Sequence, residues 1–231
     1  MIRISHRNVE TPIILETNNP MILSIENPNE YYRFAEELRK AFNGEESEFS
    51  FWINNDAFIP DKRGEILLSP FYFETSDKKV ISLLYKKLQK NFHDGNFLIE
   101  FNEINGKIEK FLLDLCSTVD FSVDYETLSI ENILKTSCVK PTQEYDGLLE
   151  KIVNYVNIFC ELKHIDFFVF VGITDVLSEI ELLKLYKHCE LQKVNLLILE
   201  HGKNKRTIEN ERKIIITEDL CELVENIEEI Y

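Results

Sequence analysis

Two short apolar runs decide the fold: Ile165-Asp166-Phe167-Phe168-Val169-Phe170-Val171-Gly172 and Val194-Asn195-Leu196-Leu197-Ile198-Leu199-Glu200. Each is too short for a typical globular helix and lacks polar–apolar alternation, which is typical of strands covered on both faces in a parallel sheet. Between the runs, Ser178 and Glu181 have the spacing of a capping box and predict the start of a helix. The stretch therefore predicts two parallel strands joined by a helix in a right-handed crossover.

A second strand and helix are predicted near the start of the chain. Residues 21–25 are a strand candidate, and residues 31–42 have helical spacing, with Asn27 as N-cap and Pro28 at the first helical position. A nucleotide-binding P-loop would lie at such a junction, but this segment has no glycine and no Gly-Lys-Ser/Thr, and Glu26 would repel phosphate. Residues 49–53 and 65–68 are further strand candidates.

The period of the apolar residues changes to a helical one at Ser76. Long helices are predicted from about residue 80 to Asp94-Gly95, from Phe97 to Val119, and from Leu148 to Lys163, with a short helix near Ile130. We therefore expect an α/β domain formed by residues 1–76 and 164–231, interrupted by a helical domain at residues 77–163.

The charge of the chain is strongly negative and unevenly spread. The 231 residues carry a net charge of −15, which argues against a generally basic nucleic-acid-binding protein. Residues 77–163 carry 11 basic and 14 acidic side chains, whereas residues 218–229 hold six acids and no base. The acidic C-terminal segment therefore supplies much of the excess negative charge.

Cysteine usage and hydropathy predict a cytoplasmic protein. The five cysteines are an odd number without a C-x-x-C pair, so reduced thiols are expected rather than disulfides or a zinc site. No apolar run approaches the ~20 residues that a membrane-spanning helix needs. The first six residues also lack the apolar region of a signal peptide.

Several stretches, in this order and spacing, together resemble one protein family. They are Ile66-Leu67-Leu68-Ser69-Pro70, Lys78-Lys79-Val80-Ile81-Ser82-Leu83-Leu84-Tyr85-Lys86-Lys87-Leu88, Val123-Asp124-Tyr125-Glu126, Phe168-Val169-Phe170-Val171-Gly172, Leu177-Ser178 and Thr217-Glu218-Asp219-Leu220-Cys221-Glu222. The chain thereby resembles the small accessory adaptation protein of type II-A CRISPR systems, over most of its length from about Leu23 to Glu222.

The resemblance implies a degenerate P-loop-like α/β head with a parallel-type sheet and an inserted helical leg. It also implies a homotetrameric ring that binds the ends of double-stranded DNA without sequence preference, acts in spacer acquisition and is not an enzyme. Calcium is the implied cofactor, and the implied partners are the CRISPR integrase complex and the type II effector nuclease. The missing Gly-Lys-Ser/Thr agrees with a degenerate head, whereas the charge of −15 does not favour DNA binding.

Four lysines are the candidate DNA-binding residues. Lys79, Lys86 and Lys90 fall within about 40° on one helix face, with Lys87 beside them. Such a row would neutralise phosphates without reading the base sequence. The alternative is an ordinary solvated face opposite the apolar stripe of the same helix.

Three carboxylates are the candidate metal ligands. Asp120, Asp124 and Glu126 lie within seven residues in an expected break between helices, and calcium prefers several oxygen ligands. The pattern is not that of an EF-hand, and the family resemblance is what favours calcium here. The alternative is a solvated acidic segment that favours the start of the following helix.

Three other features are expected to be structural rather than functional. Glu200 ends an apolar strand, as the acid of a Walker B strand does, but it lacks a Walker A partner. His188 and Cys189 adjoin on a helix and have no visible third partner for catalysis. Trp52 is expected in the core rather than as a platform for stacked bases.

Two other functions compete with a DNA-binding ring. The first is an NTPase or other nucleotide-binding enzyme on a P-loop-like fold, and it is weakened by the absence of a phosphate-binding loop. The second is a protein-interaction scaffold whose acidic segment docks basic partners.

Overall fold

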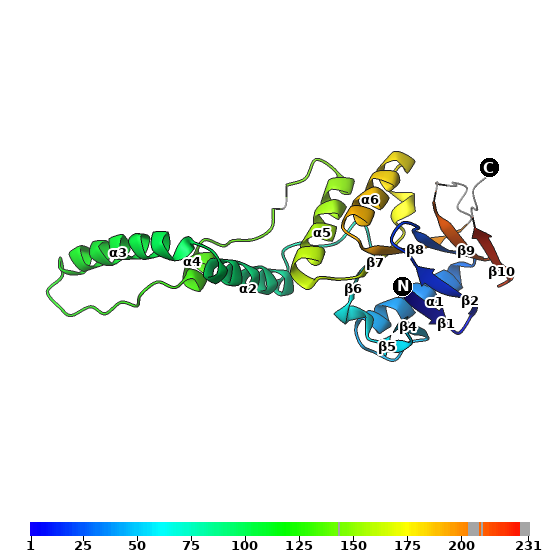
Figure 1. The fold of residues 1–231 in the computed structure, drawn as a ribbon, viewed down its shortest axis with the longest axis horizontal. Coiled ribbons are helices and arrows are strands. Elements are labelled where there is room, and N and C mark those ends of the chain that lie inside the picture. Colours follow the sequence, from blue (N-terminus) through cyan, green and yellow to red (C-terminus); the bar gives the residue numbers. More distant parts are fainter. Residues whose placement is uncertain (143, 203–207, 209, 227–231) are drawn as a thin grey trace. The chain divides into compact units, whose positions relative to one another are not determined.

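The computed structural model of the chain describes residues 1–231 except residues 143, 203–207, 209 and 227–231. The chain folds as two compact units (Figure 1). The first unit comprises residues 1–74 and 144–231, and the second comprises residues 75–143. The architecture is α/β, as predicted.

A six-stranded sheet forms the centre of the first unit. Its order is β10 (Glu222–Asn226), β9 (Arg212–Ile216), β3 (Met21–Ile25), β8 (Asn195–His201), β7 (Phe167–Val171) and β6 (Gly64–Leu67). All neighbours are parallel except β10, which pairs antiparallel with β9 at the edge. The predicted parallel pairing of the two apolar runs is confirmed, because Phe168 of β7 lies opposite Leu196 of β8.

A second, four-stranded antiparallel sheet was not predicted. Its order is β2 (Val9–Leu15), β1 (Ile2–His6), β4 (Phe49–Ile53) and β5 (Asp56–Phe58). The prediction of a strand at residues 49–53 is confirmed, but this strand pairs with the N-terminal hairpin and not with the parallel sheet.

Helices cover both faces of the six-stranded sheet. Helix α1 (Pro28–Phe42) packs with the antiparallel sheet in one apolar core, which includes Leu23 and Leu199 from one face of the six-stranded sheet. Helices α5 (Leu148–Lys163) and α6 (Glu179–Leu191) lie on the opposite side of that sheet (Figure 1). On that side, Tyr155 of α5 contacts Phe168 of β7, with ring centroids 6.1 Å apart.

The predicted helix starts of the first unit are confirmed in atomic detail. The Asn27 side chain accepts hydrogen bonds from the backbone N–H groups of Asn29 and Glu30, and Pro28 begins α1. Ser178 and Glu181 form both hydrogen bonds of the capping box of α6.

The second unit contains the predicted helices α2 (Lys78–Asp94), α3 (Phe97–Cys116) and α4 (Ile130–Thr136). The rings of Phe92 and Phe101 meet edge to face, and the Tyr85 hydroxyl donates to the carbonyl of Leu134 at 3.0 Å. These contacts hold α2 against α3 and α4. Helix α5, within the 77–163 helical domain expected from sequence, lies in the first unit.

Candidate functional site

All four candidate DNA-binding lysines lie on α2. Lys79, Lys86 and Lys90 are exposed, and Lys87 is half-buried. The Asp77 side chain caps the start of the helix by accepting a hydrogen bond from the Val80 N–H at 2.7 Å. The capped helix therefore holds the lysines in fixed register along one side.

The surroundings of these lysines differ in charge from the rest of the chain. Residues 75–143 carry nine Lys and ten Asp or Glu, so almost none of the net charge of −15 belongs to the second unit. Within the described residues, Lys86 and Lys90 make no ion pair. Their charge is therefore available to a ligand.

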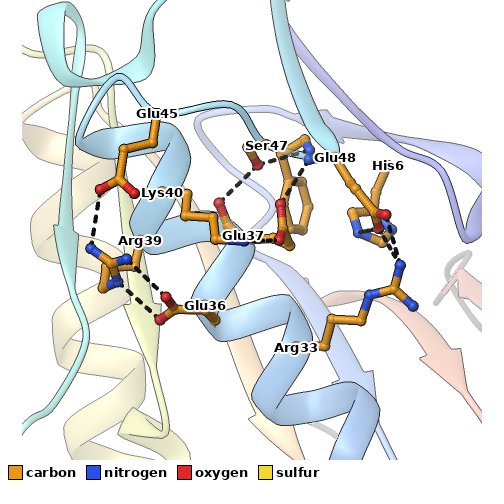
Figure 2. Close-up of polar contacts among 10 residues, drawn as sticks. His6, Arg33, Glu36, Glu37, Arg39, Lys40, Glu45, Ser47 and Glu48 are labelled. Carbon is orange, nitrogen blue, oxygen red and sulfur yellow. Dashed lines mark hydrogen bonds and ion pairs between the residues drawn. The ribbon is translucent and has the colours of Figure 1, made fainter.

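Several cations of the first unit, in contrast, form ion pairs with neighbouring carboxylates. On α1, Arg33 binds both oxygens of Glu48 at 2.7 and 2.8 Å (Figure 2). Lys40 donates to Glu37 at 2.7 Å, and Glu37 also accepts from the Glu48 N–H. Further pairs elsewhere in the unit are Arg63–Asp166, Lys163–Glu65, Arg212–Glu16 and Lys213–Glu211.

The network on α1 encloses a buried histidine. His6 packs against the rings of Phe34 and Phe49, whose centroids are 4.0 and 4.5 Å from its own. Its Nδ1 accepts a hydrogen bond from the Asn8 N–H, and its Nε2 lies 3.5 Å from Glu48 without a hydrogen bond among the described residues. Burial outweighs the attraction of Glu48 and lowers the pKa of His6 from 6.5 to about 4. His6 is therefore neutral at physiological pH.

The three candidate calcium ligands are exposed. Asp120, Asp124 and Glu126 lie between α3 and α4, in a segment without helix or strand. Across the described part of the chain, no three His, Cys, Asp or Glu side chains gather closely enough to hold a metal ion. The three carboxylates of a single chain, as arranged here, therefore do not fit a calcium site.

The end of β3, where a P-loop would lie, is occupied by the protein's own groups. Asn27 fills the position in front of α1 that an anion would take, and the Glu218 N–H donates to Glu26 at 3.1 Å. Beside it, Glu200 at the end of β8 is buried and accepts a hydrogen bond from the Thr174 hydroxyl at 2.9 Å. This arrangement offers no amide cradle for a phosphate.

A buried polar network under α6 was not predicted. The Tyr186 hydroxyl donates to Glu211 at 2.6 Å, and Lys213 Nζ lies 3.3 Å from the other oxygen of Glu211. Burial, reinforced by Glu211, raises the pKa of Tyr186, and burial raises the pKa of Cys189. The network ties α6 to β9. Burial, and not the network, keeps Cys189 an unreactive thiol. No local signal could reveal the network, because Tyr186 and Glu211 are 25 residues apart.

Two further residues have unremarkable surroundings. His188 Nε2 lies 2.9 Å from the side-chain oxygen of Asn157, a contact between α5 and α6. Trp52 on β4 is half-buried. Among the described residues, no group that contacts His188 or Trp52 would give either one a catalytic role.

The second unit exposes a large apolar surface. Helix α3 has no buried residue. Seven of its large apolar side chains are exposed: Phe97, Leu98, Ile99, Ile104, Phe111, Leu113 and Leu115. Where α3 meets α2 and α4, a groove of about 460 Å³ is lined mainly by apolar side chains, including Leu88, Phe92 and Ile133. An apolar surface of this kind marks an interaction site.

Two comparisons with known proteins agree with each other. A protein family described as CRISPR-associated protein (Cas_Csn2) matches residues 41–220. A curated protein of Streptococcus agalactiae, named CRISPR-associated protein Csn2, is 22% identical over 209 residues, which cover 87% of this chain and 89% of that protein. Both similarities extend across the two units. No described helix is long and apolar enough to cross a membrane.

Proposed function

Because the chain belongs to the Csn2 family of CRISPR-associated proteins, we propose that it acts in CRISPR adaptation as a non-catalytic protein that binds double-stranded DNA ends. The family membership confirms the resemblance seen in the sequence. In this proposal a homotetrameric ring binds DNA without sequence preference, acts in the cytoplasm, and works with the CRISPR integrase complex and the type II effector nuclease.

The observation that carries the DNA-binding proposal is the row of lysines on α2. Exposed cations at this spacing follow one side of a helix and meet phosphates, which carry no sequence information. The near-neutral second unit lets this row attract DNA despite the charge of −15, most of which the first unit carries. Repetition of the row in four subunits would concentrate positive charge around one duplex.

The apolar surface of α3 supports self-association. A 20-residue helix without any buried residue leaves too much apolar area in water for an isolated subunit. A second copy that covers Phe111, Leu113 and Leu115 would remove this area from water. Self-association of the second unit would also bring lysine rows of several subunits together.

The groups at the end of β3 support a non-catalytic head of degenerate P-loop type. Pro28 has no N–H, and Asn27 already binds the first free amides of α1. A nucleotide phosphate would have to displace Asn27 and overcome the repulsion of Glu26. This position therefore favours DNA binding over the alternative of an NTPase.

Calcium remains part of the proposal, with ligands completed by assembly. Asp120, Asp124 and Glu126 of one chain do not gather into a site, so a second subunit or a rearranged segment has to supply the remaining oxygen ligands. Clustered carboxylates brought together by assembly would repel one another, and a divalent cation would offset this repulsion.

The proposal is tested by measuring DNA affinity as a function of salt. The double variant Lys86→Gln/Lys90→Gln should bind linear duplex more weakly, and its slope of log affinity against log salt should be shallower by at least about 2. Replacing Lys79, Lys86, Lys87 and Lys90 together with Glu should abolish binding and leave the native mass of the assembly unchanged.

The matched control is Lys107→Gln/Lys110→Gln, which removes two exposed lysines of α3 in the same unit. It should keep the affinity and the salt slope of the wild type. A closed circular duplex of equal length should bind much more weakly than the linear form, because a ring offers it no entry. Equal binding of circle and linear duplex would contradict threading, and unchanged binding by the Glu variant would remove α2 from the DNA site.

A further inference from the structure

We propose that α6 of one subunit binds the acidic end of the six-stranded sheet in a second copy of the chain. The contact would join the first units of two subunits. This inference rests on the self-assembly proposed above. It adds an interface between first units to the one proposed on α3 of the second unit. The argument uses two surfaces, one on each side of the contact.

The α6 surface is apolar and basic, although the first unit as a whole is acidic. Ile180, Leu183, Lys184, Lys187 and Leu191 fall within about 100° of the helix circumference. Ile180 and Leu191 are 67% and 72% exposed, so the apolar part is not covered by the subunit itself. Within the described residues neither lysine has an ion-pair partner. The surface therefore fits a partner that presents apolar and acidic side chains together.

The β10 surface has this composition. It consists of Glu218, Asp219 and Leu220 in the turn after β9, with Leu223 and Glu225 on β10. All five side chains are exposed, and Leu220 and Leu223 are 56% and 52% exposed. Glu222 is excluded, because its carboxylate already accepts hydrogen bonds from the N–H groups of Glu10 and Thr11.

The register of the sheet places both surfaces on the same side of a subunit. Leu223 pairs with Ile215, and Glu225 pairs with Lys213. Lys213 lies on the sheet face that α6 covers, because its Nζ contacts the Glu211 carboxylate that also accepts a hydrogen bond from Tyr186 of α6. Leu223 and Glu225 therefore project from the sheet face that α6 covers.

Two complementary surfaces on one side of a subunit suit a two-fold contact. In such an interface the α6 surface of each copy meets the β10 surface of the other, so each contact forms twice. A closed tetramer with two-fold symmetry needs a second kind of interface besides one on α3, and these surfaces provide it.

Zero-length cross-linking of carboxylates to lysines tests the contact directly. A mixture of unlabelled and ¹⁵N-labelled wild-type protein is assembled, treated with carbodiimide and digested. We expect peptide pairs of mixed label that join Lys184 or Lys187 to Glu218, Asp219 or Glu225. If these lysine–carboxylate peptide pairs were absent, or if they formed only between peptides of the same label, the contact would be overturned.

Charge reversal gives an independent measurement of the same contact. Lys184→Glu/Lys187→Glu and Glu218→Lys/Asp219→Lys should each weaken assembly by about tenfold or more, and mixing the two variants should restore it. The control Arg3→Glu/Lys62→Glu makes an equal charge change at exposed positions of the same unit and should assemble normally.

The outcomes separate this inference from the proposed function. A tetrameric native mass without the mixed cross-links, and without an effect of charge reversal, would overturn the α6–β10 contact and leave the DNA-binding assembly standing. A monomeric native mass for the wild type at micromolar concentration would overturn both.

Discussion

Replacing the buried His6 should change how the stability of the first unit depends on pH. The neutral ring packs against the rings of Phe34 and Phe49, and burial lowers its pKa to about 4 from 6.5. The unfolded chain therefore binds a proton more tightly than the folded one does. The stability contributed by neutral His6 is fully present above pH 6.5 and is lost as the pH falls towards 4.

The magnitude follows from these two pKa values. Lowering the pH from 8 to 5 should remove about 2 kcal/mol of the free energy of unfolding through this one residue, as an upper estimate. At pH 8, His6→Gln should be less stable than the wild type by about 1–2 kcal/mol, because the variant loses the contacts of the ring. At pH 5 the wild type should have lost this advantage, so the two proteins should be about equally stable.

Urea unfolding, followed by the fluorescence of Trp52, is a suitable assay. Trp52 is the only tryptophan and lies on β4, the strand that also carries Phe49. The control His93→Gln removes an exposed histidine of the second unit and should leave the pH dependence unchanged. A stability difference between wild type and His6→Gln that stays constant from pH 8 to pH 5 would refute the reasoning.

Three further predictions concern the metal, the head and the core. Millimolar calcium should raise the melting temperature of the assembled wild type, by mass action, but not that of the variant in which the three candidate ligands are replaced by Asn, Asn and Gln; an equal rise in both would exclude this site. Calorimetry should detect no binding of ATP by the wild type at micromolar affinity. If the wild type bound ATP with such an affinity and Glu200→Ala did not, the non-catalytic proposal would be overturned. Gly64→Ala should destabilise the first unit by about 1–3 kcal/mol, because the added Cβ would meet the buried Phe167 ring. Gly64→Ala/Phe167→Leu should recover part of this loss in urea unfolding, and an unchanged midpoint in the single variant would contradict the packing argument.

Local signals predicted most of the helices and the buried strands. The Ser178–Glu181 capping box and the Asn27 cap are set by residues within one turn, so their hydrogen bonds follow from the sequence alone. The unbroken apolar runs at β7 and β8 predicted strands buried on both faces, and both runs are completely or almost completely buried. The lysines of α2 were likewise placed on one helix by its period.

Non-local pairing was beyond such signals. The N-terminal hairpin β1–β2 was missed, although its buried positions alternate along β1. The strand at residues 49–53 was predicted, but its partner β1 begins 47 residues earlier in the chain, at Ile2. The Tyr186–Glu211–Lys213 network also depends on the crossing of α6 over β9, which no nearby residue encodes.

The sequence by itself determined the family, the type of each strong helix and strand, and the positions of the lysines and carboxylates along the chain. Only the tertiary structure decided which elements share a core. The apolar stripe of α5, for example, has the period of any amphipathic helix, yet it is buried against Phe168 in the first unit while α3 stays uncovered. Periodicity specifies that a face has to be buried, whereas the partner that buries it depends on the shape and register of surfaces distant in the chain.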